Sequence, residues 1–459
     1  MLGACRGRNP AVPTIDWKAE PGARAEAAAL LVLDQNGTAS LVCLPSRRQV
    51  RPSFSQVALR RILDVSWKDG PMVAGWASGS DNAKQSSGGE LVLLSAHSDS
   101  RVVAQRVRTA RFSPDGSALA YEVAELQKDG ASVAPAMSYV LELATGKLTE
   151  LGASADPLWE ADSKHLRVTR LHTASEEREA APGRWTSLRA RWDRESGIVE
   201  AYGRGSAQIP APTGTAVAWS ADQRTTVDPS HCVVLLGRSG MVPHSIVGPF
   251  CMGRADDRGV RWSPDGKWLA FPREGPVHDT KPRGFIIDVV SVEGGRFPAL
   301  SALYGRVNAD QLAIATAPGS VWFDWSRSGR FLAMNDGASD LRVYDFEAQG
   351  IAFLGTGQRP LWSPGGAYLF IVASLRQDAE VAQASVLSGV APTARIDLGQ
   401  VRDARWLPAQ ACDNGLWGLR VDHRHRYVAV GSVGWPKEKS PCCQGLSLCE
   451  EGDSNPHGS

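Results

Sequence analysis

The sequence predicts an all-β fold, built as a radial repeat of four-stranded antiparallel sheets. An aromatic residue recurs along the chain at intervals close to the about 40–45 residues that one such sheet requires. The best copies are followed by a turn sequence and alternating apolar residues, which indicates two short strands joined tightly. The sequence contains no long amphipathic helix pattern. Together these observations predict a ring of small sheets.

The composition of the 459-residue chain restricts the classes of partner. The 50 Lys and Arg residues nearly cancel the 49 Asp and Glu residues and leave a net charge of +1. A broad electrostatic attraction to nucleic acid or anionic lipid is therefore not indicated. Hydrophobic residues make up 43% of the chain, enough for a packed core. The longest apolar run, Ala27–Leu33, is far shorter than the roughly 18–20 residues that span a bilayer, so we expect no transmembrane helix and no nucleic-acid partner.

The repeat is clearest at Phe112 and Trp262, which open Phe-Ser-Pro-Asp-Gly and Trp-Ser-Pro-Asp-Gly. Good copies begin at Trp325 and Trp362. Weaker copies begin at four further tryptophans, Trp67, Trp159, Trp219 and Trp406. We call these aromatic residues anchors and the sheet that belongs to each anchor a blade. The interval between anchors ranges from 37 residues, from Trp325 to Trp362, to 63, from Trp262 to Trp325, and the long intervals have room for loop insertions.

The residue types of the repeat explain its turn. Proline fixes φ, aspartate accepts hydrogen bonds from its own backbone, and glycine takes the positive φ that the turn requires. A second strand then begins, as at Leu269–Phe271, and a hairpin such as 139–151 completes the blade. The anchor is expected to pack between neighbouring sheets, where its burial stabilises the fold by roughly 1.5–3 kcal/mol. The anchors predict a β-propeller of eight blades; seven is the alternative, because the copy at Trp67 has a shortened turn.

The N-terminal part of the chain is predicted to close the ring. Leu30–Leu33 and Ala39–Leu44 flank the turn Asn36-Gly37, which is typical of a tight hairpin. Beyond two short apolar segments, little strand-like sequence follows Trp406. We therefore expect the hairpin to pair with strands after Trp406 and to supply the outer strands of that blade, which removes free edges. The predicted division is a tether at 1–28, a β-propeller at 29–435 and a disordered cysteine-containing tail at 436–459.

The motif Trp/Phe-Ser-Pro-Asp-Gly-x-x-Leu-Ala-Phe resembles the repeat of the TolB-type β-propeller family, a relative of the Trp-Asp-repeat propellers. The resemblance covers about residues 60–435. The family includes periplasmic scaffolds and the propeller domains that gate prolyl-oligopeptidase-like peptidases. The match does not extend to the helical N-terminal domain that the periplasmic scaffold carries. The resemblance therefore implies a propeller fold and leaves the partner open.

Catalytic signatures are missing from the sequence. It contains no Gly-x-Ser-x-Gly nucleophile elbow, no Gly-x-x-x-x-Gly-Lys-Ser/Thr loop and no Gly-x-Gly-x-x-Gly fingerprint. Of the residues directly before the anchors, only Asp324 is a carboxylate. We therefore predict no catalytic residues and no cofactor, and a monomeric, non-catalytic scaffold for a protein or peptide partner. The alternative is an enzyme of the lyase or glycosidase type with its active site in the central channel.

Three arginines directly precede anchors: Arg111, Arg261 and Arg405. If this position faces the central channel, their guanidinium groups could bind an acidic ligand or a carboxylate of the partner. The alternative is that they are ordinary exposed arginines of an arginine-rich chain.

His423 and His425 have the i, i+2 spacing that places two side chains on one face of a strand. No third ligand accompanies them, so no metal site is predicted.

The cysteines allow two disulfides. Cys43 in the N-terminal hairpin and Cys412 after the last anchor are candidate partners. Cys232 and Cys251 flank one hairpin and form the second candidate pair. Disulfides of this kind require an oxidising compartment, and free buried cysteines are the alternative.

The first residues bear on localisation. Leu2-Gly3-Ala4-Cys5 resembles a bacterial lipobox, which makes Cys5 the candidate lipidation site. On this hypothesis the true start lies upstream of Met1, and the chain is exported as a lipoprotein to the periplasm or the outer membrane. A chance match is the alternative, since the charged and apolar regions of a signal peptide do not precede Cys5, and the chain is then cytoplasmic.

Overall fold

The fold is almost entirely β-structure in the residues that the structure describes. The only described helical turn is a short 3₁₀ segment, η3, at Ala409–Cys412. No helix in this part of the chain is long and apolar enough to cross a membrane. The all-β prediction is therefore confirmed here. The computed structural model describes residues 27–52, 57–67, 71–77, 88–95, 100–124, 136–173, 185–204, 206–213, 217–221, 233–237, 244–246, 261–274, 285–291, 322–335, 340–373, 381–389, 395–412, 419–421 and 427–429.

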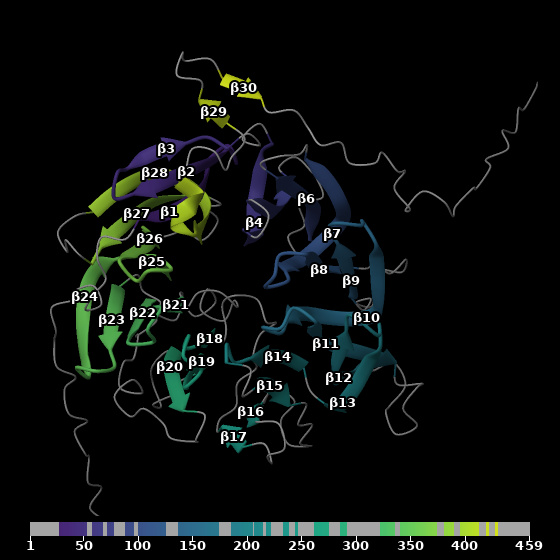
Figure 1. Ribbon diagram of the computed structural model, residues 1–459. Helices are drawn as coiled ribbons and strands as arrows, with labels where there is room; N and C mark the ends of the chain where they lie inside the picture. Colours follow the sequence, from purple (N-terminus) through teal and green to yellow (C-terminus); the bar gives the residue numbers. More distant parts are fainter. Residues whose placement is uncertain are drawn as a thin grey trace, which may run out of the picture.

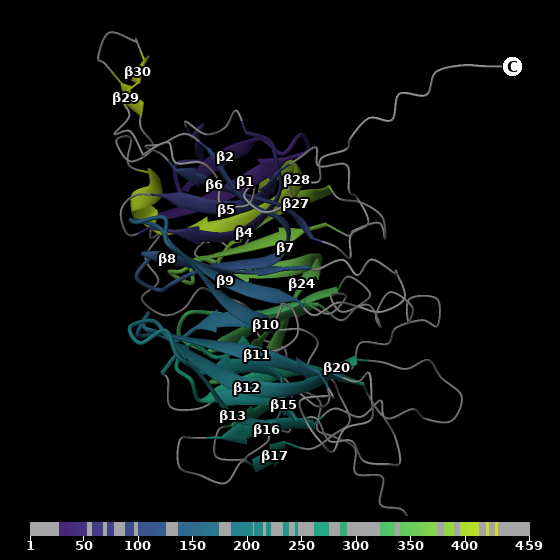
Figure 2. The same cartoon turned by 90° about the vertical axis from the view of Figure 1, so that its right-hand side faces the viewer.

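Small antiparallel sheets stand around a common centre like the blades of a propeller (Figure 1). One sheet illustrates the plan, with strands following one another outwards from the centre: β21 (Phe323–Trp325), β22 (Phe331–Asn335), β23 (Asp340–Asp345) and β24 (Gly350–Thr356). The strand nearest the centre carries the anchor Trp325, as the repeat predicts. When the molecule is turned, successive sheets lie one above another (Figure 2). The β-propeller prediction therefore describes the arrangement of the sheets.

The largest sheet has ten strands in sequential order: β4 (Leu59–Ser66), β5 (Met72–Ala77), β6 (Gly89–Ser95), β7 (Arg101–Phe112), β8 (Ala118–Val123), β9 (Met137–Glu142), β10 (Leu148–Trp159), β11 (His165–Thr173), β12 (Trp185–Asp193) and β13 (Val199–Arg204). A four-stranded sheet follows: β14 (Ser206–Pro210), β15 (Val217–Ala221), β16 (Val233–Gly237) and β17 (His244–Ile246). The next sheet has three described strands: β18 (Arg261–Trp262), β19 (Trp268–Glu274) and β20 (Phe285–Ser291).

One sheet contains ten strands because β7 and β10 each belong to two blades. The first half of β7 pairs with β6 and its second half with β8, and β10 is shared in the same way between β9 and β11. The register shifts near the middle of each strand, where Arg106 and Asp156 have positive φ values of 57° and 53°. Such irregularities bend a strand and increase its twist. They let one strand run from the rim of one blade to the centre of the next, which the sequence analysis did not predict.

The N-terminal hairpin joins the last sheet. Strand β1 (Ala28–Asp34) is antiparallel to the second half of β28 (Arg395–Leu407), with Leu30 opposite Trp406. The predicted hairpin forms and lies in the sheet that contains Trp406, but β1 pairs with the strand of Trp406 itself and not with strands after it. The reason is that β28 spans two blades. The full order is β25 (Gln358–Trp362), β26 (Tyr368–Val372), β27 (Ala382–Ser388), β28, β1, β2 (Ala39–Leu44) and β3 (Arg48–Val50).

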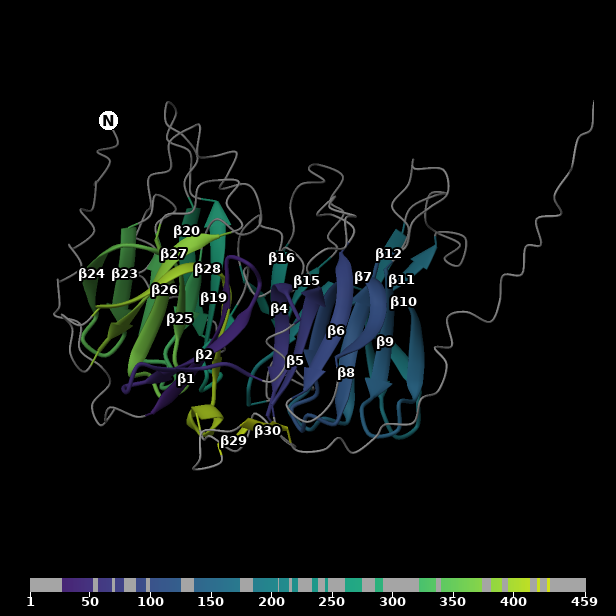
Figure 3. The same ribbon diagram turned by 90° about the horizontal axis from the view of Figure 1, so that it is seen from above.

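Two further details differ from the expected blade. The hairpin supplies the strands next to β28, and β3 is the outermost strand of the sheet. The strands after Trp406, β29 (Leu419–Val421) and β30 (Tyr427–Ala429), pair with each other in a separate small sheet. Figure 3 shows this pair outside the large sheets.

The structure does not confirm Trp219 as an anchor. Trp219 lies within β15, the second strand of its sheet, and not at the end of the first. The first strand, β14, ends at Pro210 and is followed by a turn that includes residues 211–213. Ala211-Pro212-Thr213 therefore stands where Ser-Pro-Asp stands in the other copies. Pro210 replaces the aromatic residue at the anchor position, so the repeat cannot be recognised there by an aromatic residue. The nearest tryptophan, Trp219, lies in the next strand.

The anchors pack between neighbouring blades, as the repeat predicts. Trp159 is 7% exposed and belongs to one hydrophobic cluster with Ala118 and Val140 of the preceding blade and Leu166 and Val168 of its own. Four further anchors are similarly buried: Phe112, Trp262, Trp325 and Trp362. In these blades one large aromatic side chain fills the wedge between two twisted sheets, which close packing of a protein interior requires.

The turn after each well-formed anchor is held by its own motif. Gly116 has a φ of 69°, and the Asp115 carboxylate accepts the backbone N–H of Ser117 at 3.1 Å, as predicted. The serine of the motif has a role that the sequence analysis missed. Oγ of Ser113 accepts the backbone N–H of Ala118 at 3.0 Å and ties the start of the second strand to the end of the first. Equivalent bonds join Ser263 to Trp268, Ser326 to Phe331, and Ser363 to Tyr368.

Candidate functional site

The strands nearest the centre receive hydrogen bonds from adjacent blades. The Arg111 guanidinium donates to the backbone carbonyl of Leu63 at 3.2 Å. The Arg405 guanidinium donates to the carbonyl of Ile62 at 3.3 Å. An innermost strand has a partner strand on one side alone, so polar side chains can satisfy backbone groups on its free edge. The structure therefore places these two predicted binding residues at blade-to-blade contacts, and ligand binding by them stays a prediction.

The anchor tryptophans also bond to the preceding blade. In each case the indole N–H donates to the carbonyl of the residue directly before the preceding anchor. The bonds join Trp159 to Arg111 (3.1 Å), Trp325 to Arg261 (3.2 Å), Trp362 to Asp324 (3.2 Å) and Trp406 to Leu361 (2.9 Å). A buried indole N–H usually finds such an acceptor. The bond gives a physical reason for the abundance of tryptophan at this position, since phenylalanine fills the same space without a donor.

Three aspartates complete the contacts between innermost strands. Each accepts a backbone N–H from the neighbouring blade, a bond strengthened by the charge of the carboxylate. The bonds join Asp64 to Phe112 (2.8 Å), Asp324 to Trp362 (2.8 Å) and Asp403 to Ile62 (2.9 Å). The sequence analysis missed Asp64 and Asp403. The sequence does contain a pattern that could have identified them: Asp64 and Asp403 each lie three residues before an anchor, Trp67 or Trp406.

Asp324 connects three blades. Its carboxylate forms an ion pair with Arg261 of the preceding blade and accepts the backbone N–H of Trp362 in the following one. Its backbone carbonyl accepts the indole N–H of Trp362. Burial raises the pKa of Asp324, while Arg261 and the N–H of Trp362 oppose this rise. The carboxylate that the enzyme alternative singled out is thus engaged in structural bonds.

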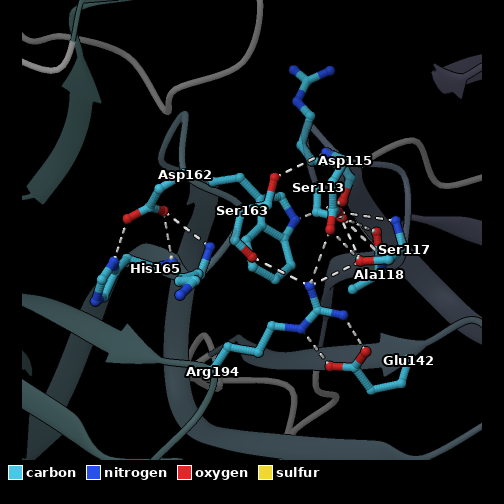
Figure 4. A network of polar contacts seen from close by, with 12 residues as sticks. Ser113, Asp115, Ser117, Ala118, Glu142, Asp162, Ser163, His165 and Arg194 are labelled. Atoms are coloured by element: carbon cyan, nitrogen blue, oxygen red, sulfur yellow. Dashed lines mark hydrogen bonds and ion pairs between the residues drawn. The ribbon is translucent and has the colours of Figure 1, made fainter. Parts of the chain in front are cut away.

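A second polar network links several turns at one end of two neighbouring blades. Arg194, directly after β12, donates through Nε to Oε1 of Glu142 at 2.8 Å and through Nη1 to Oγ of Ser117 at 2.9 Å. Nη1 also reaches the carbonyl of Ser163 at 3.3 Å. Figure 4 shows the guanidinium between these groups. Hydrogen bonding to Glu142 raises the pKa of Arg194, so this arginine acts as a permanently charged connector of two blades.

His165 lies between two carboxylates of its own blade. Its Nδ1 is 2.5 Å from Oδ2 of Asp162, and its Nε2 is 3.0 Å from Oδ2 of Asp193. Partial burial alone would raise the pKa of Asp162, but hydrogen bonds from His165 and from the backbone of Lys164 outweigh burial and lower it. Hydrogen bonds from the backbone and hydroxyl of Ser196 lower the pKa of Asp193. The arrangement holds two turns of this blade together.

The same region contains a set of metal-ligand types. Ligand atoms of Glu160, Asp162 and His165 lie within 4.8 Å of one another. Both oxygens of Glu160, however, already bind arginines: Arg191 donates to them at 2.9 and 2.8 Å, and Nε of Arg167 is 3.0 Å from Oε1. Two guanidinium groups disfavour a cation at Glu160. The set is better described as an ion-pair network than as a metal site.

Replacing Asp162 by asparagine should reduce stability in a pH-dependent way. A carboxylate whose pKa is lowered in the folded state stabilises the fold above its unfolded pKa of about 3.9, and this contribution is lost as the pH falls through the folded pKa. We expect the wild type to melt higher than Asp162→Asn at pH 5, by the equivalent of no more than about 1 kcal/mol because the pair is exposed. The difference should shrink toward pH 2.5. Thermal unfolding followed by circular dichroism measures it, and a difference independent of pH would contradict the assignment.

The predicted cysteine and histidine sites divide into two groups. Cys43 and Cys412 are joined by a disulfide, with their Cα atoms 5.7 Å apart. The other candidates, Cys5, Cys232, Cys251, His423 and His425, lie outside the described residues.

The fold and these contacts define the chain as a β-propeller whose blades are linked near the centre. No family model matches it, and no curated protein matches it. It is similar to solved structures at 12% identity: dihydro-heme d1 dehydrogenase NirN in complex with DHE (TM-score 0.49, covering 86% of this chain and 79% of that one), TolB from Acinetobacter baumannii (0.37, 82% and 81%) and the β-propeller domain of the Trilobed protease from Pyrococcus furiosus (0.41, 73% and 97%). At these values the similarities assign no function.

Proposed function

We propose that the protein is a non-catalytic β-propeller scaffold that binds a protein or peptide partner. The observation that carries this proposal is that polar side chains near the centre form bonds between neighbouring blades. Asp64, Asp324 and Asp403 accept backbone N–H groups of adjacent blades, and Arg261 is paired with Asp324. A lyase or glycosidase requires carboxylates that are free to reach a substrate. Carboxylates committed to holding blades together favour the scaffold over the enzyme.

The proposed scaffold has eight blades and a ring closed by the N-terminal hairpin. Strands β28, β1, β2 and β3 supply the blade of Trp406, which supports closure by the hairpin. Sharing of β7 and β10 between blades accounts for three blades in the ten-stranded sheet. The sheets that begin with β14, β18, β21 and β25 account for the remaining four.

Exposed apolar side chains at the rim favour a protein or peptide as partner. Among the described residues, four large hydrophobic side chains are exposed: Val102, Leu148, Ile198 and Phe353. Each lies in the outermost strand of a blade or directly before it. Phe353 on β24 has the greatest exposed fraction, 60%. Aromatic side chains are enriched among the residues that dominate binding energy at protein interfaces.

Affinity purification followed by titration tests the proposal. Tagged protein should retain a protein partner, and Phe353→Ser should weaken its affinity by about tenfold or more. Thr356→Ala is the matched control, because Thr356 is exposed on the same strand; it should change the affinity less than about twofold. Both variants should melt as the wild type does. Equal affinity of Phe353→Ser and the wild type would show that the rim at Phe353 does not contact the partner. Turnover of a sugar substrate would favour the enzyme alternative.

A further inference from the structure

The two ends of the propeller are joined covalently. Cys43 lies in β2 of the N-terminal hairpin, and Cys412 ends η3, which follows the strand of Trp406. Their disulfide links positions 369 residues apart in the sequence. The Cα–Cα distance of 5.7 Å is in the range usual for disulfides. The bond therefore connects the first strands of the propeller to its last described turn.

We propose that this disulfide is a redox-controlled clasp that holds the N-terminal hairpin on the last blade, and that the chain completes its folding in an oxidising compartment. Strand β1 is held on β28 by backbone pairing from Ala29 opposite Leu407 to Asp34 opposite Val401, and the side-chain contacts beside this ladder include two exposed ones. Arg402 donates to the carbonyl of Gln35 at 2.9 Å, and Arg48 donates to the carbonyl of Cys412. Exposed contacts of this kind restrain a chain end weakly. The covalent bond is therefore the strongest single restraint on opening.

Apolar packing positions the two thiols for the bond. Cys43 is 3% exposed and belongs to one hydrophobic cluster with Leu31, Leu407 and Ala411, against which Cys412 also packs. The hairpin must already be docked before the sulfurs can meet. The disulfide therefore forms only after the hairpin has docked, and it then holds the hairpin in that position.

The chemistry is a thiol–disulfide exchange with a disulfide-carrying oxidoreductase of the compartment. Cys412 is the more accessible thiol, since Cys43 is buried. Its thiolate attacks the disulfide of the oxidant, forming a mixed disulfide and releasing one thiolate of the oxidant. The Cys43 thiolate then attacks the sulfur of Cys412, forms the protein disulfide and releases the reduced oxidant. The protein loses two protons and two electrons, and the oxidant gains them.

The position of the Cys43–Cys412 disulfide indicates that it would control detachment of the N-terminal hairpin. Strand β1 is made first, but its partner β28 is made about 360 residues later, so docking closes a very long loop. A cross-link over such a separation removes much of the entropy of the opened state. Reduction should therefore raise the frequency of brief openings in which the hairpin detaches and docks again, too short-lived for the other blades to unfold.

Alkylation and native-state hydrogen exchange test the clasp. In protein purified from an oxidising compartment, iodoacetamide should leave Cys43 and Cys412 unlabelled until dithiothreitol is added. Dithiothreitol should then speed amide exchange in 29–33 by at least about tenfold and leave exchange in β8 and β9 unchanged. Mass spectrometry reads both results on the full chain.

The double variant Cys43→Ala/Cys412→Ala is the control. It should exchange at 29–33 like the reduced wild type and should not respond to dithiothreitol, which separates the clasp from effects of other cysteines. If the double variant does not fold, the comparison of oxidised and reduced wild type remains decisive. Labelling of both thiols without reductant, or equal exchange of the hairpin before and after reduction, would overturn the proposal.

Discussion

Deletion of residues 1–45 is expected to abolish cooperative folding. It removes β1 and β2, whose apolar side chains are almost wholly buried, and leaves the second half of β28 without a partner strand. Seven of the lost side chains are large and at most 4% exposed: Leu30, Leu31, Val32, Leu33, Leu41, Val42 and Leu44. At roughly 1.5–3 kcal/mol each, the loss is on the order of 10–20 kcal/mol, which exceeds the stability of most domains. Light scattering and circular dichroism should show an aggregated chain without a cooperative melt.

A shorter deletion provides the control for this experiment. Removing residues 1–20 takes away most of the predicted tether and leaves the hairpin, so that variant should melt like the full chain. A truncation at 45 that stays monomeric and keeps the melting temperature of the full chain would show that the hairpin does not close the ring. The unpaired edge of β28 is the physical reason to expect aggregation.

Replacing Asp324 by alanine is expected to cost about 3–5 kcal/mol of unfolding free energy. The substitution leaves Arg261 without the carboxylate that neutralises it and the backbone N–H of Trp362 without its acceptor. Both groups are partly or fully buried between blades, which makes the loss large. Asp324→Asn should cost less, because the amide oxygen can still accept the N–H. Urea unfolding measures the change in free energy as a shift in midpoint at constant slope.

Two controls test whether the loss of stability in Asp324→Ala comes from its contacts between blades. Glu195→Ala, on an exposed turn, should alter stability by less than about 0.5 kcal/mol. A double-mutant cycle with Arg261→Ala should show a coupling energy of at least about 1 kcal/mol, since the two residues contact each other. Additive effects of the two substitutions, or a cost below about 1 kcal/mol for Asp324→Ala, would show that the contact does not hold the blades together.

The local parts of the fold could be predicted because they depend on a few neighbouring residues. The positive φ of Gly37 in the Asn-Gly turn, at 79°, and that of Gly116, at 69°, follow from turn chemistry alone. Burial of Trp159 follows from the aromatic repeat. The same dependence on local pattern makes the prediction at Trp219 wrong, because Pro210 occupies the anchor position and the nearest tryptophan lies in the second strand.

The candidate site could be predicted only in part. The position before the anchor was predicted to bind a ligand, whereas the structure shows Arg111, Arg261 and Arg405 in contacts with neighbouring blades, and ligand binding by them stays a prediction. Their partners were not foreseen, because each partner lies on another blade. Nothing in a single repeat indicates that Arg111 will reach the carbonyl of Leu63, 48 residues earlier.

Short strands, tight turns and a repeated aromatic core can be predicted from the residue pattern, because turn residues and alternating apolar residues act over a few positions. The passage of β7, β10 and β28 through two blades, and the N–H groups of adjacent blades that Asp64, Asp324 and Asp403 accept, become visible in the folded structure alone. The disulfide between Cys43 and Cys412, a candidate pair in the sequence, likewise depends on docking of the N-terminal hairpin. These features depend on how twisted sheets pack around a centre, which brings together backbone edges and side chains that are remote in sequence.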